Sequence, residues 1–193
     1  MSAQPTAIRS RVAGDLPDLV AALWRQQPAT RYPLRNPLPF PAEDFLHADD
    51  AAAAWTAHAG GRILGHACWL RAPAAAAQHG VDPATGARST AAEACAAAHA
   101  CDVDELAWVS ALFVDPAARG VGLGPRLLAT VVDDIRARGL RPCLEVVDVN
   151  EAAVRRYRAD GWRTVLRSRP AWLAETIDDP DVGTSTMVLL AER

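Results

Sequence analysis

Lysine is missing from this sequence: all 20 basic residues in the chain of 193 are arginines. A Walker-type phosphate-binding loop ends in Gly-Lys-Ser/Thr, so this class of nucleotide site is excluded. The formal net charge of −3 is also unsuited to sequence-independent nucleic-acid binding, because that mode of binding requires a basic surface. We therefore expect no nucleic-acid partner.

Long apolar stretches are missing as well. The sequence contains no apolar run of about 18 residues, which excludes a transmembrane helix and predicts no membrane partner. Its first residues, MSAQPTAIRSRVAGDLPDLV, lack the apolar core of a secretory signal peptide. A cytoplasmic location is therefore expected.

Cysteine is scarce, with four copies and no CxxC pair. A chain of this length does not depend on a disulfide scaffold, so the thiols are expected to be reduced. Cys95, His99 and Cys101 cluster in the sequence, but their spacing fits no standard zinc site and no fourth ligand is evident. The sequence therefore predicts no metal site.

Alanine is abundant instead, with 41 copies, many of them within residues 72–104. Thr90 and Glu93 have the spacing of a capping box, which predicts a helix from there to about Ala100. Alanine favours helix but buries little apolar area, so we expect this helix to pack loosely or to contact a partner. The chain, 1–193, is predicted to form a single domain with an Ala-rich helical insertion at 72–104.

Hydrophobic periodicity predicts alternating strands and helices elsewhere. Apolar residues at helical spacing after Asp15 predict a helix, and Gly60-Gly61 predicts a hairpin. Between them, four prolines in Thr30–Pro41 predict an ordered loop. These elements predict an α/β fold with a mixed, mostly antiparallel central sheet of about seven strands, flanked by helices on both faces. The expected strands are 8–12, 53–59, 63–70, 105–114, 143–147, 162–166 and 186–190.

A glycine-rich loop, 115–124, follows the strand expected at 105–114 and precedes a helix expected to begin at Pro125. Backbone N–H groups at a helix N-terminus attract anions, and glycines let phosphate oxygens approach closely because they have no Cβ. The dinucleotide-binding fingerprint is excluded, because it would require glycine at the position of Pro125. The loop is therefore a candidate phosphate site that relies on backbone amides.

A second motif lies on the helix expected at 151–160. Asn150, Ala153 and Tyr157 are spaced to share one face of that helix, and Gly161-Trp162 ends it. Together with the loop, this motif resembles the GNAT superfamily of N-acetyltransferases. The matching pieces are Leu112-Phe113-Val114-Asp115-Pro116, Arg119-x-x-Gly122-x-Gly124, Leu144-x-Val146 and Asn150…Tyr157…Gly161-Trp162. The resemblance covers residues 106–166, extends to the first 70 residues only through the order of their elements, and does not extend to 71–104.

The resemblance implies acetyl-CoA as the co-substrate. The backbone of residues 112–114 would pair with the pantetheine arm as an added strand does, and the loop amides would hold the pyrophosphate. Pro125 stands where family members often carry Ser or Thr, so it offers neither a hydroxyl nor an amide. The cofactor-binding residues implied are Leu112, Phe113, Val114, Arg119, Gly120, Val121, Gly122, Leu123, Gly124, Pro125, Asn150, Ala153 and Tyr157.

The resemblance also implies that Tyr157 lies near the thioester sulfur and protonates the departing thiolate, as a neutral phenol can do. Many relatives carry a Glu inside the central strand, but here Trp-Val-Ser occupies 108–110. Glu105, at the expected start of that strand, is the candidate general base. Glu145 in the next strand is the second candidate, and water remains a third.

The sequence thus predicts an N-acetyltransferase that transfers an acetyl group from acetyl-CoA to a primary amine of a small molecule. The amine would attack the thioester directly, through a tetrahedral intermediate. A protein or peptide N-acetyltransferase and a non-catalytic acyl-CoA-binding regulator are the alternatives. A homodimer stays open as the oligomeric state, since symmetric pairs are the commonest oligomers.

Overall fold

The computed structural model describes residues 6–71 and 73–191, which form two compact units. Unit 1 contains the described residues up to Leu70 together with Val109–Asp134, and unit 2 contains Arg71–Trp108 and the residues from Ile135 onward. The chain passes between the units after β3, within β6 and within α4. Each unit is described by itself below.

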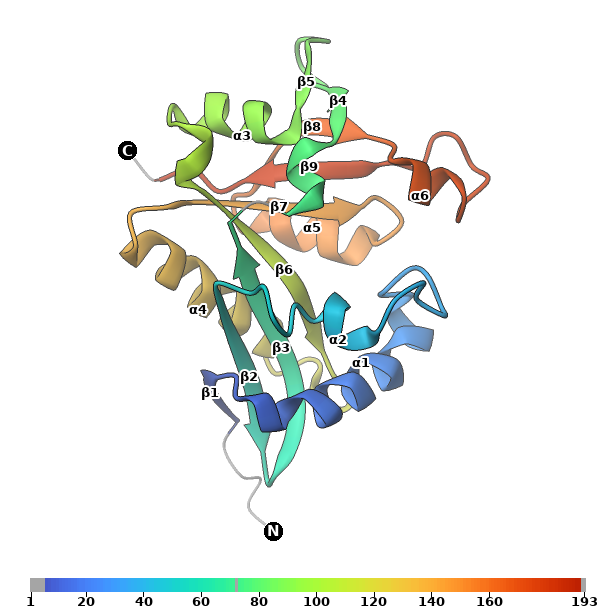
Figure 1. The fold of residues 1–193 in the computed structure, drawn as a ribbon, viewed down its shortest axis with the longest axis vertical. Coiled ribbons are helices and arrows are strands. Elements are labelled where there is room, and N and C mark those ends of the chain that lie inside the picture. The colour runs from blue at the N-terminus through green and yellow to red at the C-terminus, as the bar shows by residue number, and fades with distance from the viewer. Residues whose placement is uncertain (1–5, 72, 192–193) are drawn as a thin grey trace. The chain divides into compact units, whose positions relative to one another are not determined.

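Unit 1 holds the N-terminal strands in the order β1-β2-β3-β6. The β2–β3 connection is the predicted hairpin, and Gly60 (φ 58°) and Gly61 (φ 73°) adopt the left-handed conformation that such a tight turn needs. Helices α1 and α2 lie in front of β3 in Figure 1, and α4 begins behind it. The elements are β1 (Ala7–Ser10), η1 (Ala13–Asp15), α1 (Leu16–Thr30), α2 (Ala42–Phe45), β2 (Ala53–Ala59), β3 (Arg62–Leu70), β6 (Leu106–Val114), η4 (Pro116–Ala118) and α4 (Leu123–Ala137).

The core of unit 1 joins α1 to the strands. Leu19 and Leu23 of α1 are fully buried against Ile63 of β3 and Phe113 of β6, and Leu46 closes the cluster. Burying a leucine side chain contributes roughly 1.5–3 kcal/mol, so this cluster is a substantial part of the stability of unit 1. It also holds β6 in place immediately before the glycine-rich loop.

Unit 2 holds the C-terminal strands in the order β7-β9-β8-β4-β5. Its ladders β7–β9, β8–β9, β4–β8 and β4–β5 are all antiparallel. Its elements are η2 (Ala74–Ala77), β4 (His79–Val81), β5 (Arg88–Thr90), α3 (Ala91–His99), η3 (Val103–Glu105), β7 (Arg141–Val147), α5 (Glu151–Ala159), β8 (Arg163–Ser168), α6 (Ala171–Ala174) and β9 (Thr184–Val188).

The predicted α/β class, with largely antiparallel strands flanked by helices, is confirmed, but the described residues contain nine strands rather than about seven. The two additional strands, β4 and β5, form a hairpin within residues 72–104. Three-residue strands are too short to show a hydrophobic period. Gly80 allows β4 to lie close against β8, because a Cβ there would collide with the carbonyl oxygen of Arg167.

The predicted Ala-rich helix is confirmed as α3. Thr90 Oγ1 accepts a hydrogen bond from Glu93 N at 3.2 Å, and Thr90 N donates to Glu93 Oε2 at 2.7 Å, which is the expected capping box. The expectation of loose packing is wrong, because Ala91 and Cys95 are fully buried in a core cluster with Trp108. Small residues let the helix approach the sheet closely, and the bulky sheet residues supply the apolar area.

Several expected boundaries move in the structure, and two of them concern residues of the candidate site. Glu105 belongs to the 3₁₀ turn η3, so β6 begins at Leu106 instead of at Glu105. Helix α4 begins at Leu123, so Pro125 is its third residue. A backbone N–H in the first turn has no intrahelical acceptor, so the proline costs the helix no hydrogen bond. All four cysteines carry free thiols. Among the described residues, no helix has the length and hydropathy needed to cross a membrane.

Candidate active site

The turn between β6 and α4 is anchored by a buried carboxylate. Asp115, only 2% exposed, accepts a hydrogen bond from Ala117 N at 3.0 Å, and its Oδ2 pairs with Arg25 Nε and Arg62 Nη2, each at 3.1 Å. Burial opposes ionisation of Asp115, but the Ala117 amide and the two guanidinium groups outweigh it and lower the pKa of this carboxyl. The start of the loop is therefore tied to both α1 and β3.

The backbone amides of residues 120–124 are available to a ligand. In the part of the chain that the structure describes, none of them has a protein acceptor. Gly120 and Gly122 have left-handed φ angles of 78° and 74°, and a Cβ added at either would meet open space. Backbone conformation therefore requires these glycines. A row of free N–H groups at the start of the 15-residue helix α4 is an anion-binding arrangement.

The last residues of β6 alternate in burial. Phe113 points into the core of unit 1, whereas Leu112 and Val114 are half-buried. Asp115 N donates to Leu64 O at 2.8 Å, so the end of the strand is held against β3. The pairing of residues 112–114 with a pantetheine arm stays a prediction.

Helix α5 carries the second motif, and its exposure pattern agrees with the predicted shared face. Ala153 and Tyr157 are half-buried, whereas Arg155, Arg156 and Arg158 are exposed. Asn150 occupies the N-cap position, but its side chain makes no capping hydrogen bond. Asn150 therefore caps the helix by position alone, and its side-chain amide group is left for another partner.

Tyr157 packs its ring against Trp162 in an edge-on arrangement, with centroids 6.0 Å apart and planes at 61°. Burial, and then the nearby Asp160 carboxylate, raise the pKa of Tyr157 to about 12, so the phenol is neutral at physiological pH. Among the described residues the Tyr157 hydroxyl has no hydrogen-bond partner, so its proton is available for donation.

Glu145 lies on β7, half-buried, directly opposite Thr186 in the ladder with β9. Burial raises the pKa of Glu145 to about 7, although a hydrogen bond from Thr184 Oγ1 to Glu145 Oε2 at 3.3 Å partly opposes this shift. The hydroxyl of Thr186 is buried with no partner in the described structure. A carboxyl that titrates near neutrality and an unsatisfied hydroxyl thus share one face of the sheet of unit 2.

Glu105 has a different environment. Its Oε2 accepts a hydrogen bond from Asp102 N at 2.9 Å, which completes a capping box around η3. This carboxylate is thus occupied in its own turn. The two threonines beside Glu145 were not singled out from the sequence, where the only signal was a Thr-x-Thr alternation at 184–186.

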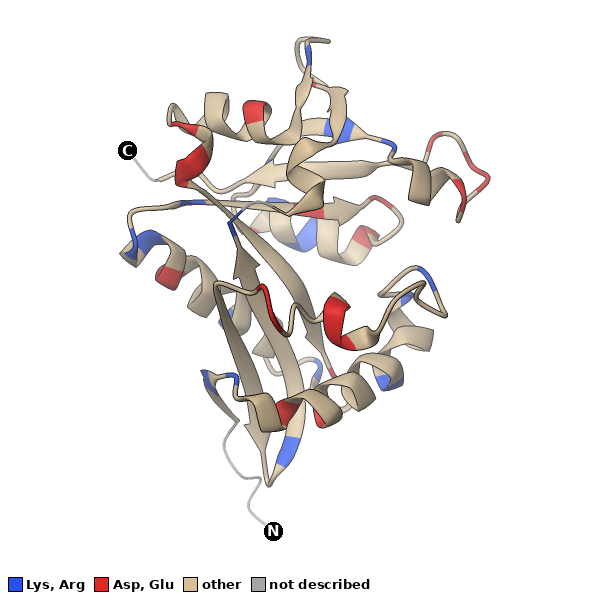
Figure 2. Ribbon diagram, in the orientation of Figure 1, with Lys and Arg blue, Asp and Glu red and all other residues tan. Residues whose placement is uncertain are grey.

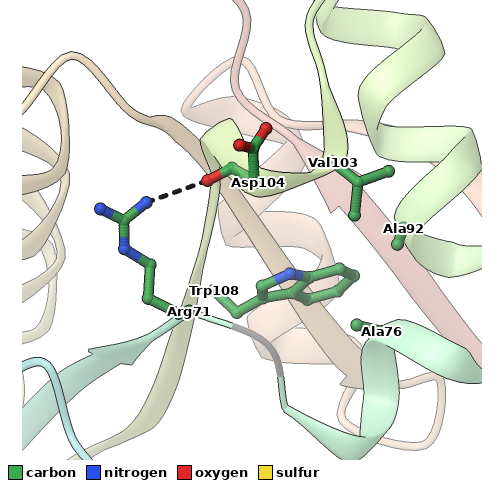
Figure 3. Close-up of a pocket in the computed structure, with 6 residues that line it drawn as sticks. All are labelled: Arg71, Ala76, Ala92, Val103, Asp104 and Trp108. Carbon is green, nitrogen blue, oxygen red and sulfur yellow. Dashed lines mark hydrogen bonds between the residues drawn. The ribbon is translucent and has the colours of Figure 1, made fainter.

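Unit 2 also contains a pocket of about 780 Å³ between η2, α3 and η3 (Figure 3). Arg71 Nη1 donates to the carbonyl oxygen of Asp104 at 3.0 Å on one side, and Trp108 presents its ring on the other. None of the predicted catalytic or cofactor-binding residues lines this pocket. The lining residues are Arg71, Ala76, Ala92, Val103, Asp104 and Trp108.

Comparison with known families assigns this chain. The model of the acetyltransferase (GNAT) family matches residues 16–162, most of the chain. The chain belongs to the GNAT family. This GNAT protein is therefore an enzyme, an acetyltransferase that depends on acetyl-CoA. A comparison with curated protein sequences gives no significant match.

Solved structures agree with the GNAT fold. The ribosomal-protein-S18-alanine N-acetyltransferase of Escherichia coli superposes with a TM-score of 0.62 at 17% identity, covering 98% of this chain and 97% of that one. The yncA protein of Salmonella typhimurium, solved with its cofactor acetyl-CoA, gives 0.60 at 14% identity, with 95% and 92% covered. An IAA acetyltransferase from Bacillus cereus gives 0.60 at 11% identity, with 96% and 99% covered. At these identities the similarity concerns the fold alone.

Proposed function

We propose that this GNAT enzyme transfers the acetyl group of acetyl-CoA to a primary amine of a small molecule. The amine attacks the thioester carbonyl directly and forms a tetrahedral intermediate. The observation that carries this proposal is the contrast between two groups of unit 2. Glu145, with a pKa of about 7, can accept a proton at neutral pH, while Tyr157, with a pKa of about 12, keeps one to donate.

Each group has one task in this scheme. Glu145 takes the proton that the amine must lose, directly or through a water held by the unsatisfied hydroxyl of Thr186. Tyr157 donates its proton to the thiolate of CoA as the C–S bond breaks. Glu105 is the weaker candidate for the base, because its carboxylate already caps η3.

The cofactor is held by backbone groups and by Asn150. The free amides at residues 120–124 bind the pyrophosphate, where the partial positive charge of the helix N-terminus contributes about 0.3–1 kcal/mol per anionic group. Residues 112–114 pair with the pantetheine arm, and the uncommitted side chain of Asn150 donates to it. Pro125 contacts the phosphates without donating to them.

Two features of unit 1 support a small cationic acceptor. Exposed carboxylates gather on and after α2 (Figure 2), at Glu43, Asp44, Asp49 and Asp50, and they attract an ammonium group over roughly a Debye length. The proline-rich loop is held against α1, because Gln27 Nε2 donates to Pro33 O at 3.2 Å and Asn36 Nδ2 donates to Gln27 Oε1 at 3.0 Å. A loop fixed in this way favours an enclosed acceptor site over an open peptide groove.

A peptide N-terminus is the second candidate acceptor. The fold similarity to the S18-alanine N-acetyltransferase of Escherichia coli favours it, since that enzyme acts on a protein. The two candidates differ in the length of acceptor that the site must admit.

One experiment tests both. CoA should raise the melting temperature of the protein, and free thiol released from acetyl-CoA should be measured with a panel of small primary amines and with peptides that begin with alanine. We expect thiol release that depends on small amines. Thiol release that occurs with peptides and not with small amines would show that the acceptor is a peptide. A melting temperature that does not change with millimolar CoA would contradict the proposed cofactor site.

A further inference from the structure

Three polar side chains of unit 1 are linked by hydrogen bonds, and the proposed amine chemistry assigns no catalytic step to any of them. His47 Nε2 lies 2.9 Å from Ser110 Oγ, and His47 Nδ1 lies 3.0 Å from Asp50 Oδ1. Ser110 lies on β6, and His47 and Asp50 follow α2. The result is a carboxylate, an imidazole and a hydroxyl in hydrogen-bonded order, which is the arrangement that activates a serine nucleophile.

The direction of these hydrogen bonds follows from the chemistry of each group. An ionised Asp50 can only accept, so it favours the tautomer in which His47 Nδ1 carries the hydrogen. Nε2 is then the acceptor and receives the O–H of Ser110. The side chain of His47 is 21% exposed and that of Asp50 is 70% exposed, so Asp50 orients the ring from the solvent side.

The backbone around His47 is held in an unusual conformation. His47 has a φ of 53°, in the left-handed region that non-glycine residues rarely adopt. The guanidinium of Arg11 donates to the carbonyl oxygens of Leu46 at 2.6 Å, His47 at 2.7 Å and Ala48 at 3.1 Å. One cation thus fixes the turn that presents the imidazole, and such strained positions concentrate at functional sites.

Ser110 is held just as firmly from the other side. The next residue, Ala111, has a φ of 48° inside a strand, and its carbonyl oxygen accepts from His66 Nδ1 at 3.0 Å. His66 Nε2 in turn lies 3.2 Å from Arg11 Nη1, and the carbonyl oxygen of Ser110 accepts from Cys68 Sγ at 3.5 Å. Arg11 therefore holds the turn that carries His47 and, through His66, also the backbone beside Ser110.

The position of Ser110 on β6 relates it to the acetyl group, and this step rests on the proposed function. Ser110 is half-buried, as are Leu112 and Val114, which lie two and four residues further along the same strand. With the pyrophosphate at residues 120–124 and the pantetheine along 112–114, the thioester end of acetyl-CoA extends toward Ser110.

We propose that Ser110 is an acyl-accepting nucleophile, activated by His47 and positioned by Asp50, which gives the enzyme a second activity, the hydrolysis of acetyl-CoA when no amine is bound. Ser110 Oγ attacks the thioester carbonyl while its proton passes to His47 Nε2. The C–S bond breaks, and the leaving thiolate takes that proton and departs as CoA. Water then attacks the carbonyl carbon of the acetyl-serine ester and gives one proton to His47. The ester C–O bond breaks, His47 passes that proton to Ser110 Oγ, and acetic acid is released, which loses its remaining proton to solvent.

The absence of lysine makes the intermediate easy to identify. Intact-protein mass spectrometry after mixing with acetyl-CoA should show one added acetyl group, and no lysine can carry it. Alkaline hydroxylamine cleaves an acetyl ester on serine and leaves an acetyl amide on the N-terminal amine, whereas neutral hydroxylamine cleaves a thioester on a cysteine but not the serine ester. We expect a hydroxylamine-sensitive adduct in the peptide that contains Ser110.

Four variants separate a catalytic role from a structural one. Ser110→Ala should lower amine-free release of CoA about 100-fold or more and abolish the adduct, whereas Ser110→Cys should still be acetylated. His47→Gln can still hydrogen-bond to Ser110 but cannot carry the proton, so it should fold normally and lose hydrolysis. Asp50→Asn, which only positions the ring, should lower kcat about tenfold and leave KM for acetyl-CoA unchanged. Ser89→Ala, at a half-buried serine of β5, is the matched control and should change nothing.

The outcomes distinguish this proposal from the proposed function. If CoA raises the melting temperature and amine acetylation proceeds, but no hydroxylamine-sensitive adduct forms and Ser110→Ala hydrolyses acetyl-CoA at the wild-type rate, the nucleophile is wrong and the transferase stands. If CoA does not bind at all, both proposals fall. If the melting temperatures of the variants lie within a few degrees of wild type, a loss of hydrolysis comes from the missing catalytic group and not from unfolding.

Discussion

Arg11 Nη1 lies 3.2 Å from His66 Nε2, and this contact determines where a fully buried imidazole carries its hydrogen. A guanidinium can only donate, so Nε2 accepts and Nδ1 holds the hydrogen that it gives to Ala111 O at 3.0 Å. Burial lowers the pKa of His66 to about 4, with help from the charge of Arg11 and against the hydrogen bond to Ala111. The left-handed backbone at Ala111, next to Ser110, is therefore held by a neutral histidine.

The first prediction concerns stability in acid. The pKa of His66 is lower in the folded state than its ordinary value of 6.5, so the unfolded chain binds the proton more tightly between pH 6.5 and about 4. Relative to the His66→Gln variant, the free energy of unfolding should fall by about 3 kcal/mol over that interval; in the total it is opposed by Glu145, whose pKa is raised to about 7. Urea unfolding at several pH values measures it. His66→Gln should remove this dependence and His58→Gln should keep it, and an imidazole signal of His66 that titrates near 6.5 would contradict the assignment.

The second prediction concerns the base. Glu145 must be ionised to accept a proton, so kcat/KM for the amine should rise with pH through about 7 and then level off. Glu145→Gln should lower kcat/KM roughly 100- to 1,000-fold and flatten this limb. Glu151→Gln is the control, since Glu151 is exposed on α5 and pairs with Arg155 of the same helix. If kcat/KM of Glu145→Gln still rises with pH near 7, the general base is Glu105 or water instead of Glu145.

The third prediction concerns the acid. Tyr157→Phe removes the hydroxyl but keeps the ring that packs on Trp162, so the melting temperature and CoA binding should be close to those of wild type. Turnover should fall about 100-fold or more, because the thiolate loses its proton donor. Because the pKa of Tyr157 is about 12, the wild-type enzyme should show no falling limb from this group up to pH 10 or so. Full turnover in the phenylalanine variant would rule out the acid role.

The fourth prediction concerns the loop. Gly122→Ala introduces a Cβ at a φ of 74°, which costs about 1–2 kcal/mol in backbone strain and disturbs the amides that we propose bind the pyrophosphate. Gly86→Ala is a matched control, because Gly86 has a φ of 75°, equally open surroundings and a place in the β4–β5 turn. Both variants should lose similar stability, and only Gly122→Ala should raise KM for acetyl-CoA. An equal KM in the two variants would place the pyrophosphate elsewhere.

Local spacing was sufficient to predict the parts of this fold that depend on near neighbours in the chain. The shared face of Ala153 and Tyr157, the capping box of Thr90 and the glycine loop after β6 each lie within one element or one turn. Sequence did not predict the β4–β5 hairpin, because three-residue strands show no period. It also predicted the packing of α3 wrongly, because the bulky partners of that helix, such as Leu166 and Val188, lie on distant strands.

By itself, the sequence determined that this chain is a GNAT enzyme with an amide-based loop and no lysine, because these properties depend on which residues follow one another. The tertiary structure decided the burial and the hydrogen-bond partners of each ionisable group. Glu145 owes its pKa of about 7 to burial on β7 beside Thr184, 39 residues later, and Glu105 is occupied by its own turn. Ser110 meets His47 across 63 residues. Burial and hydrogen bonding between distant segments set proton affinity, and only the folded chain brings those segments together.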